Sequence, residues 1–415
     1  MNGPLQSLFG LGVIVGITWL LSENRKAIPW RTVAIGLGLQ FLLALLLIKL
    51  PFTQTVFIGL NQVVLVLDQA TTAGTSFVFG YLGGGELPFK PSNPANSFIL
   101  AFNALPLIIV VSALSALLFY WRVLPWIVKQ LAFLLARSMG IGGALGLGAA
   151  VNIFVGMIEA PLLIRPYLAK FNRTELFALM STGMATIAGT MMVLCASILS
   201  GIREDALGQI LSASVISIPA ALVIALILIP GKAKGRAEEV EIQSEASSSM
   251  DAITRGTLDG VKLLINVVAM LIVFVALVAL INIGLALLAD VNGEPLTLQR
   301  ILGFLFAPLV WLMGIPADEV VAAGSLMGIK TILNEFLAYL QLVALPQGAL
   351  SARSEMIMLY ALCGFANFGS LGIMLGGMGT MVPERRVEIA GMGLKSILAG
   401  TLATMMTGAY VGILV

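Results

Sequence analysis

Long apolar runs, separated by short polar links, dominate the pattern of hydrophobic and polar positions along this chain. An α-helix needs about 20 mainly apolar residues to cross the hydrocarbon core of a bilayer, and several runs approach or exceed that length. The pattern therefore predicts an all-α integral membrane protein with about eight transmembrane helices. The predicted spans are Leu5–Leu21, Val33–Leu50, Phe98–Trp121, Thr174–Leu199, Ala206–Ile229, Leu258–Leu288, Met356–Met378 and Val387–Val415.

The remaining segments are too short, too polar or too interrupted to be full spans. Each is interpreted from its length, its charge and its content of Gly and Pro. The predictions are an interfacial helix at Phe57–Leu67, a loop at Gly80–Asn96, amphipathic helices at Leu124–Arg137 and Leu298–Met313, broken apolar segments at Gly142–Leu168 and Pro316–Leu345, and a linker at Pro230–Arg255.

Composition supports a membrane protein and removes several kinds of chemistry. Of the 415 residues, 59% are apolar and 11% are charged, whereas soluble domains carry about 25% charged residues. The absence of histidine excludes His-based catalysis and His-ligated metals. Cys195 and Cys363 both lie in apolar runs, which argues against a disulfide framework or a thiolate metal site. The net charge of +2 is too small to indicate nucleic-acid binding.

The chain start and the basic residues predict the orientation of the protein. Met1–Pro4 carries no basic residue and no small-residue cleavage site follows Leu21, so we expect no cleavable signal peptide. Most Lys and Arg residues fall in the link after the first span, in 122–173, in the 230–257 linker or at Arg385–Arg386. If the link after the first span is cytoplasmic, all of these regions lie on the cytoplasmic side of the membrane, where basic residues accumulate. This predicts that both termini lie outside.

The two halves of the chain repeat one order of elements. Each amphipathic helix ends in Met-Gly-Ile and is followed by a broken segment with one central acid, Glu159 or Glu335. A span with Gly-x-Ala-Thr or Gly-x-Ala-Asn comes next, at Gly183–Thr186 and Gly364–Asn367. An odd number of spans separates the equivalent starts, so the two copies are predicted to be inverted. Inverted repeats with broken helices build a midplane site in secondary transporters.

The broken segments are predicted to be re-entrant hairpins whose tips carry the site. Non-helical backbone at membrane depth must be buried in protein or line a wet cavity. Gly156 permits a turn, and Pro161 suits the first turn of a returning helix. Ionisable side chains at this depth are usually functional, which favours binding roles for Glu159 and Glu335; capping a neighbouring helix is the alternative.

Further polar residues lie in the two spans that follow the hairpins and in the first hairpin. Asn367 and Ser370 can bind ligand hydroxyls from a stretch that small residues allow to unwind, and Phe365 is predicted to face the ligand. Asn152 and Thr186 offer uncharged hard oxygens beside potential backbone carbonyls. Such oxygens suit a dehydrated monovalent cation better than zinc or copper.

The motif Asn334-Glu335-Phe336-Leu337-Ala338-Tyr339, which follows Gly328-Ile329-Lys330, closely resembles the signature of concentrative nucleoside transporters, with Leu337 in place of valine. The stretch Gly364–Ser370 resembles a second motif of that family, and the hairpin before Pro161 resembles its Gly-Gln-Thr-Glu motif. The resemblance implies a cation-coupled symporter that imports nucleosides across a bacterial inner membrane. It also implies a homotrimer surrounded by membrane lipid, with elevator-type alternating access.

The resemblance also assigns parts of the chain. Residues 1–97 would form N-terminal scaffold helices with an interfacial helix, and 230–257 a cytoplasmic linker. Residues 98–229 would form the first repeat with its hairpin at 142–170, and 258–415 the second repeat with its hairpin at 316–345.

Site residues follow from the resemblance position by position. It implies that Glu335, Asn367 and Ser370 bind the ribose hydroxyls and that Phe365 packs on the nucleoside. The other implied substrate contacts are Met157, Ile158, Glu159 and Met191. It places sodium, the co-transported ion, on side-chain oxygens of Asn152 and Thr186 and on the backbone carbonyls of Val155 and Ile187.

One departure from the family pattern affects the expected substrate. Met157-Ile158 replaces the Gln-Thr of the family motif, so two polar contacts to the base are lost. A site with fewer specific hydrogen bonds discriminates less between bases. This predicts a broader or altered base preference, with uridine-like or purine nucleosides as substrates. The alternatives are proton coupling, a channel, and a membrane enzyme acting on a lipid or nucleotide, for which no nucleophile–base pair or phosphate loop is found.

Overall fold

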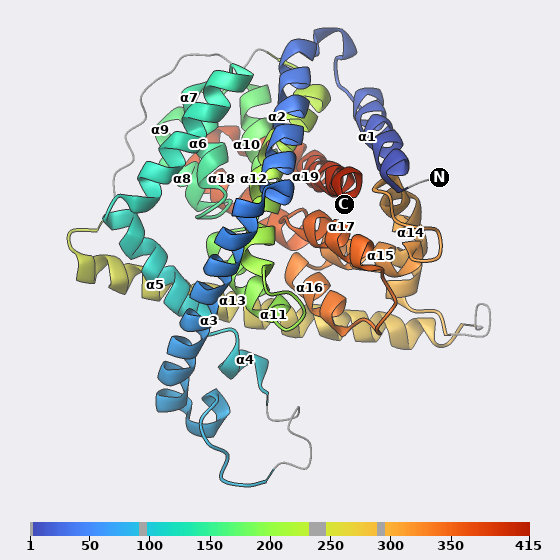
Figure 1. Cartoon of the computed structure of the whole chain (residues 1–415). Coiled ribbons are helices and arrows are strands. Elements are labelled where there is room, and N and C mark those ends of the chain that lie inside the picture. Colours follow the sequence, from blue (N-terminus) through green and yellow to red (C-terminus); the bar gives the residue numbers. More distant parts are fainter. Residues whose placement is uncertain (1–2, 91–97, 232–245, 289–294) are drawn as a thin grey trace.

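The computed structural model describes residues 3–90, 98–231, 246–288 and 295–415, and these residues form helices and no strands (Figure 1). Within them, eight helices are long and apolar enough to cross a membrane. The number agrees with the sequence prediction, but one member differs. Phe52–Gly83 qualifies, whereas the predicted span Met356–Met378 is divided into two helices that are each too short.

The N-terminal part consists of three long helices and two short 3-10 turns. The helix α3 has 29 residues, so the predicted short helix Phe57–Leu67 was wrong in length. Leu50 alone separates α2 from α3, and Pro51 takes the first turn, where its missing N–H costs no hydrogen bond. Figure 1 shows α3 extending away from the body of the molecule. The elements are α1 (Gly3–Leu20), η1 (Arg25–Ala27), α2 (Trp30–Lys49), α3 (Pro51–Phe79) and η2 (Gly80–Gly83).

The described residues between 98 and 231 contain the predicted amphipathic helix, a broken helical segment after it and a broken span. The span predicted at Phe98–Trp121 is interrupted around Pro106, which cannot continue the hydrogen-bond ladder of a helix. The elements are α4 (Leu100–Asn103), α5 (Leu107–Tyr120), α6 (Val123–Met139), α7 (Gly143–Val151), α8 (Glu159–Leu163), α9 (Arg165–Leu168), α10 (Arg173–Ala185), α11 (Gly189–Leu199) and α12 (Ala206–Leu228).

The elements after residue 246 follow a similar order, and the first of them begins earlier than the predicted span Leu258–Leu288. The helix α13 starts at Ser249, so the predicted linker 230–257 extended too far; its residues 232–245 lie outside the described part. The side chain of Ser248 accepts a hydrogen bond from the Asp251 amide at 3.1 Å, which caps the helix. The elements are α13 (Ser249–Leu285), α14 (Leu298–Leu312), α15 (Val320–Ile332), α16 (Glu335–Ala344), α17 (Ala352–Leu362), α18 (Phe368–Met381), η4 (Pro383–Arg385) and α19 (Arg386–Leu414).

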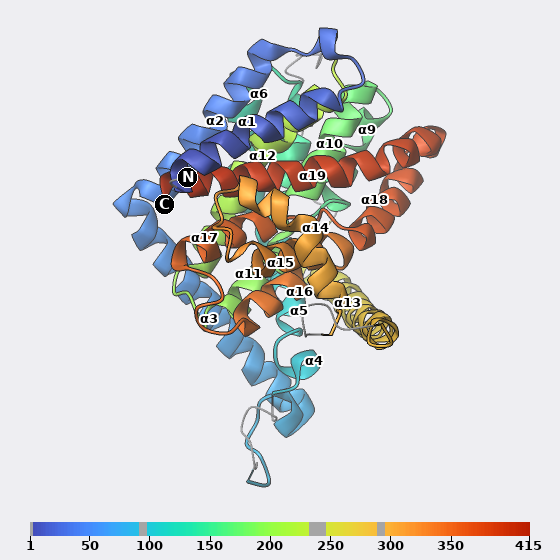
Figure 2. The same cartoon turned by 90° about the vertical axis from the view of Figure 1, so that its right-hand side faces the viewer.

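Two helices form the centre of the molecule, and one lies at its edge. Most residues of α12 and α19 are buried, and these helices pack against each other, against α10 and against the N-terminal helices (Figure 2). By contrast, the most apolar window of α13 has none of its residues buried. The long helix α13 packs chiefly along α5, where Gly256 and Gly260 allow its backbone to approach Ser112 and Ile109 closely.

Polar contacts join the chain ends and the first interhelical link to the rest of the molecule. Arg353 donates to carbonyls of Gly314 and Gly412 and contacts Ser7, so the start of α1 and the end of α19 lie at the same end. Glu23, between α1 and α2, accepts hydrogen bonds from Arg173 at 3.0 Å and from Lys395. Partial burial opposes its ionisation, but these two cations together hold the pKa of Glu23 below its usual value.

Candidate functional site

The breaks in the two broken spans meet in the interior of the molecule. The backbone N–H of Phe365, between α17 and α18, donates to the carbonyl of Thr186, between α10 and α11, at 3.1 Å. Gly364 has a φ of 154°, and a side chain there would collide with Thr404 and press tightly on the backbone of Met184 and Ala185. The close approach therefore favours glycine, and it brings two breaks that are far apart in sequence into one site.

The predicted ribose-binding residues lie together at the first turns of two helices. Glu335 is the first residue of α16, and Asn334 caps that helix by accepting from the Leu337 amide at 2.8 Å. Asn367 caps α18 by accepting from the Ser370 amide at 2.7 Å, and its Nδ2 donates to Oε2 of Glu335 at 3.2 Å. Glu335 and Asn367 are 2% and 1% exposed. The structure thus forms a buried polar pair at the helix N-termini, where the partial positive charge favours a carboxylate.

The predicted cation ligands lie at the opposite ends of two other helices. Asn152 follows the last residue of α7 and Thr186 follows the last residue of α10. Nδ2 of Asn152 donates to Oγ1 of Thr182 at 3.3 Å, and Oγ1 of Thr186 donates to the carbonyl of Thr182 at 2.9 Å. Oδ1 of Asn152 is buried without a hydrogen-bond partner. An unpaired buried oxygen between two helix C-termini fits a dehydrated monovalent cation.

The tip of the first hairpin packs against both broken spans. Met157 lies against Gly183 of α10, and Ile158 lies against Gly377 of α18. The carboxylate of Glu159 folds back over Gly156, where a methyl group would collide with it, and the residue is exposed. The hairpin is also joined to the first broken span by the N–H of Gly189, which donates to the carbonyl of Phe154 at 3.2 Å.

The other predicted site residues differ in how far their side chains are buried. Met191 is 6% exposed in the first turns of α11, and Ile187 is fully buried in the break before that helix. Phe365 and Val155 are partly exposed. The structure therefore places Met191 and Ile187 beside one break and Phe365 in the other.

Three residues of this region had no predicted role. Thr182 holds both Asn152 and Thr186, and its position four residues before Thr186 on one helix is the sequence signal that could have identified it. Lys330 of α15 is fully buried, and its Nζ donates to the carbonyl of Ala361 at 2.7 Å and to Thr404 at 2.8 Å. The contacts of Lys330 and Thr404 join elements far apart in sequence and leave no local signal.

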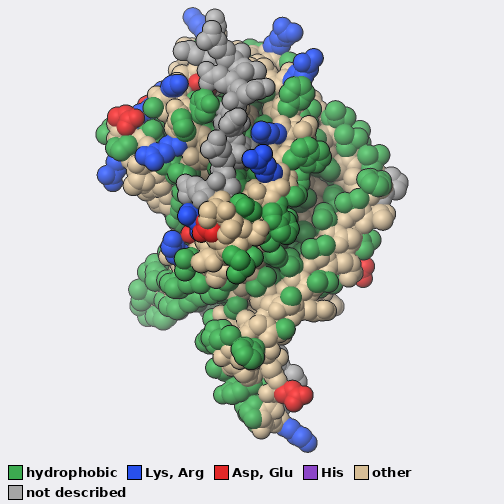
Figure 3. All heavy atoms as spheres, turned by 90° about the vertical axis from the view of Figure 1, so that its left-hand side faces the viewer, with side chains coloured by type: hydrophobic (Ala, Val, Ile, Leu, Met, Phe, Trp, Pro, Cys, Tyr) green, Lys and Arg blue, Asp and Glu red, His purple; other side chains and the backbone are tan. Residues whose placement is uncertain are grey.

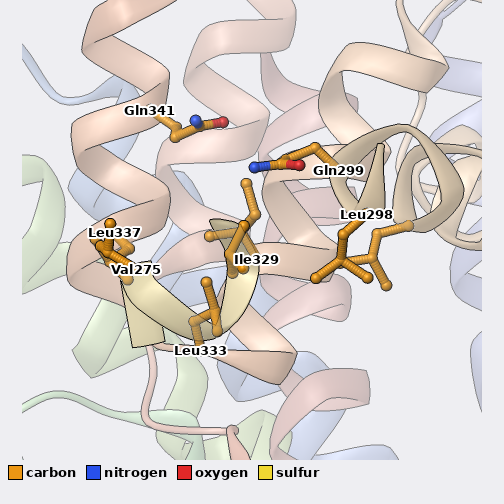
Figure 4. Close-up of a pocket in the computed structure, with 9 residues that line it drawn as sticks. Val275, Leu298, Gln299, Ile329, Leu333, Leu337 and Gln341 are labelled. Atoms are coloured by element: carbon orange, nitrogen blue, oxygen red, sulfur yellow. The ribbon is translucent and has the colours of Figure 1, made fainter. Parts of the chain in front are cut away.

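A separate hollow of about 550 Å³ lies between the second hairpin (α15 and α16) and the helices α13 and α14 (Figure 4). Aliphatic side chains line most of it, and the amides of Gln299 and Gln341 face it from two helices. None of the predicted site residues lines it. The hollow therefore separates the second hairpin from α13 over part of their length and is distinct from the buried polar site.

The fold and the site define a class of protein. Broken helices and hairpins converge on a buried polar pair beside a cation-compatible oxygen set, in a multi-pass helical protein, which is the organisation of a secondary carrier. No group of three or more Cys, Asp or Glu side chains in the described residues could hold a metal ion. Comparisons with known proteins identify the family.

Three family models match the chain. "Na+ dependent nucleoside transporter C-terminus" matches residues 209–412, "Na+ dependent nucleoside transporter N-terminus" matches residues 9–82, and "Nucleoside recognition" matches residues 101–201. The chain belongs to the Na⁺-dependent nucleoside transporter family, whose members are transporters and not enzymes.

Curated relatives cover nearly the whole chain. An uncharacterized transporter of Haemophilus influenzae is 37% identical over 99% of this chain and 98% of its own length. Nucleoside permease NupC of Helicobacter pylori is 34% identical over 99% of this chain and 98% of its own length. Sodium/nucleoside cotransporter 1 of mouse is 36% identical over 99% of this chain but only 64% of its own length.

Solved structures give the same result. CNTnw in an inward-facing, substrate-bound state is 36% identical with a TM-score of 0.89, covering 99% of this chain and 97% of that one. A doubly substituted CNTnw in an outward-facing state is 35% identical with a TM-score of 0.91 over the same shares. The fold predicted from sequence is therefore confirmed as that of a helical nucleoside transporter.

Proposed function

We propose that this protein is a sodium-coupled symporter that imports nucleosides by an elevator-type movement of its substrate site. The observation that carries this proposal is a backbone hydrogen bond, from Phe365 to Thr186, that joins two candidate sites. One site holds the unpaired Oδ1 of Asn152 beside Thr186, and the other holds the Glu335–Asn367 pair beside Phe365. The named activity of relatives such as the mouse sodium/nucleoside cotransporter supports the same substrate and ion.

The nucleoside would bind between the two hairpins and the two broken spans. The adjacent hydroxyls of a ribose are donors that match the carboxylate of Glu335, and charged acceptors make the stronger hydrogen bonds. Nδ2 of Asn367 supplies a donor beside that carboxylate, and it can turn from Glu335 to a ribose oxygen. Ser370 lies one turn away in α18, and Phe365 offers a ring face to the nucleoside.

Sodium would bind to the oxygens of Asn152, Thr186, Val155 and Ile187. The amide of Asn152 is oriented by its donor contact to Thr182, which leaves Oδ1 free to bind a cation. The hydroxyl of Thr186 points its proton at the Thr182 carbonyl, so its lone pairs are also free. Four uncharged oxygens suit a monovalent ion, which loses less hydration energy than a divalent one.

The two sites would be coupled through the breaks. The carbonyl of Thr186, next to its ligand hydroxyl, accepts the N–H of Phe365, and Asn367 follows two residues later. Ordering of Thr186 and Ile187 by sodium would therefore order the stretch that holds the nucleoside. Each ligand would bind more tightly in the presence of the other, as linkage requires.

An elevator-type movement needs firm contacts within a fixed part and a looser contact between that part and the moving one. The glycine contact of α13 with α5 is close, whereas the hollow in Figure 4 separates α13 from part of the second hairpin. We assign α13 and α5 to a fixed scaffold and the hairpins with the broken spans to the moving part. The repeated order of elements supports an inverted repeat with re-entrant hairpins, since those two copies bracket the site.

The protein would lie in a bacterial inner membrane with both termini outside. Figure 3 shows Lys and Arg side chains gathered toward one end of the molecule and hydrophobic side chains over its middle. Basic residues accumulate on the cytoplasmic side of membrane proteins. The relatives that match over nearly their full length include several bacterial proteins.

The base would be recognised with few direct hydrogen bonds. Met157 and Ile158 offer apolar contacts in place of the polar pair of the family motif, and both pack closely against neighbouring glycines. Glu159 remains as the one charged group of the hairpin tip. We therefore propose a broad base preference that includes uridine and purine nucleosides.

The test is uptake of radiolabelled uridine into proteoliposomes, with and without an inward sodium gradient at fixed pH. We expect uptake to require sodium, and Asn152→Ala to raise the half-saturating sodium concentration at least roughly tenfold, a loss of about 1.4 kcal/mol in sodium binding. Asn61→Ala is the matched control, because Oδ1 of Asn61 is also buried without a partner but lies on α3. A panel of competing nucleosides measures the base preference in the same assay.

Other outcomes would redirect the proposal. Uptake that ignores sodium but responds to an inward proton gradient would leave the nucleoside site and remove the sodium site. Unchanged sodium dependence in the Asn152 variant would also reject these ligands. Failure of every nucleoside to enter or compete would reject the substrate class.

A further inference from the structure

The amphipathic helix α6 exposes cations and aromatic rings along one face. Trp126 and Phe133 are 66% and 64% exposed, and Lys129 and Arg137 are exposed beside them. Because each of these residues lies three or four positions from the next, they form one stripe along the helix. The side chains buried on the other face are all apolar: Pro125, Val128, Ala132, Leu135 and Met139.

No acidic side chain balances the cations of this stripe. No Asp or Glu lies between Glu86 and Glu159 in the sequence. In the part of the chain that the structure describes, no salt bridge includes Lys129 or Arg137. The guanidinium carbon of Arg137 lies 5.9 Å from the centre of the Phe133 ring, so the cation and the ring are neighbours. The stripe therefore presents uncompensated positive charge beside exposed aromatic surface.

Two span ends place the start of α6 at the boundary of the membrane. Leu100–Tyr120 is long and apolar enough to cross a membrane, and α6 begins shortly after it, at Val123. Nε1 of Trp121 donates to Oγ of Ser249, the first residue of the long span α13, at 3.2 Å. The helix α6 itself is not among the described helices that could cross. An amphipathic helix at this boundary lies along the membrane surface.

The other predicted amphipathic helix, α14, offers an internal comparison. Its exposed residues from position 301 onward are all apolar: Ile301, Phe304, Leu305 and Pro308. Both helices bury an apolar face, so packing against the body of the molecule does not account for the cations of α6. The exposed face of α14 suits apolar surroundings, whereas that of α6 suits a surface that offers apolar contact and negative charge together.

We propose that the exposed stripe of α6 is a binding site for the headgroups of anionic phospholipids. Lys129 and Arg137 bind phosphate oxygens, and Trp126 and Phe133 enter the layer between headgroups and acyl chains. Lys and Arg side chains extend along apolar surface while their charges reach the headgroups. Under the proposed orientation this site lies on the cytoplasmic surface. The binding itself does not depend on which solute the protein carries.

A second copy of this chain fits the stripe less well than lipid does. In a symmetric contact each stripe would meet its own equivalent, so Lys129 and Arg137 would face the same cations with no acid on either α6. Like charges placed opposite each other disfavour association. An anionic lipid surface, with negative charge above an apolar layer, matches both the cations and the rings.

The experiment titrates the purified full chain with phosphatidylglycerol or phosphatidylcholine and measures binding by native mass spectrometry. We expect phosphatidylglycerol to bind more tightly than phosphatidylcholine in the wild type. Each cation near an anionic lipid surface contributes about fivefold in affinity, so Lys129→Gln together with Arg137→Gln should weaken phosphatidylglycerol binding about 25-fold. The affinity for phosphatidylcholine should stay the same.

Two further variants separate a local site from net charge. Arg255→Gln together with Lys262→Gln removes the same charge from the start of α13, where these cations pair with Asp251 and Asp259. This control should bind phosphatidylglycerol as the wild type does. Lys129→Arg keeps the charge of the stripe and should also retain wild-type affinity.

The outcomes are independent of the proposed function, because the binding assay contains neither sodium nor nucleoside. Equal wild-type affinity for the two lipids would overturn the lipid site. So would full phosphatidylglycerol affinity in the α6 double variant, or an equal loss in the α13 double variant, which would indicate net charge alone. Absence of sodium-driven uptake would reject the transport proposal and leave the lipid site standing.

Discussion

Asparagine side chains at this site orient backbone and ligand groups at the same time. Oδ1 of Asn367 caps α18, while its Nδ2 contacts the carboxylate of Glu335. Nδ2 of Asn152 contacts Thr182, while its Oδ1 stays unpaired. An amide carries both donors and an acceptor, so each residue can belong to the helix end and to the binding site together.

Glu335→Gln tests the ribose assignment. Hydrogen bonds to a charged acceptor contribute about 1.5–3 kcal/mol each, so loss of the charge should weaken nucleoside binding at least tenfold. Scintillation proximity binding of labelled uridine in detergent measures this affinity. Glu384→Gln, an exposed acid in η4, is the control and should bind as the wild type does. Equal affinity in both variants would remove Glu335 from the ribose site.

At the scale of elements, helix ends divide the site into two electrostatic regions. The helices α16 and α18 begin at the Glu335–Asn367 pair, and α7 and α10 end at Asn152 and Thr186. Helix N-termini favour a carboxylate and helix C-termini favour a cation. Interrupted helices thus provide charge selectivity at membrane depth. The unpaired backbone groups at their ends are buried in protein, where they can bind ligands.

Gly260→Leu tests the close contact between α13 and α5. A side chain at residue 260 would meet the backbone of Ile109, and overpacking of this kind costs about 1–3 kcal/mol. We expect a lower unfolding temperature in a thiol-reactive or scattering assay and slower uptake. Gly284→Leu on the same helix is the matched control, because nothing lies within 4 Å of that position. Equal unfolding temperatures in the two variants would contradict the fixed contact.

At the scale of the whole molecule, large apolar surfaces remain uncovered. Residues of α3 and α13 such as Val66, Ile265, Ile272 and Ile283 are more than half exposed. Lipid can cover such surfaces, but contact between copies of the chain would also give the fixed part of an elevator a stable support. We therefore propose a homotrimer in which α13 takes part in the contact between copies.

Mass measurement of the protein in lipid nanodiscs should give three copies per particle. Ile272→Asn should shift particles toward single copies, because it places an amide on the contact face of α13. Leu42→Asn, on the exposed side of α2, should leave the assembly unchanged. Single copies in the wild type would reject the trimer, and an unaffected Ile272 variant would reject this face.

The sequence by itself determined the membrane class, most of the spans, the two broken segments and the family. These features depend on local composition: apolar run length decides a span, and Gly, Pro and acids within an apolar run mark a break. The motif around Asn334 and Glu335 identified the family, which the comparisons confirm. The roles of the site residues stay predictions.

Only the tertiary structure decided which of these residues meet. The length of α3 and the start of α13 at the Ser248 cap differ from prediction, because local capping competes with composition at element ends. The pairs Glu335–Asn367, Asn152–Thr182 and Lys330–Thr404 join residues 32, 30 and 74 positions apart. Such contacts depend on how helices pack through space, which hydrophobic periodicity along one segment does not record.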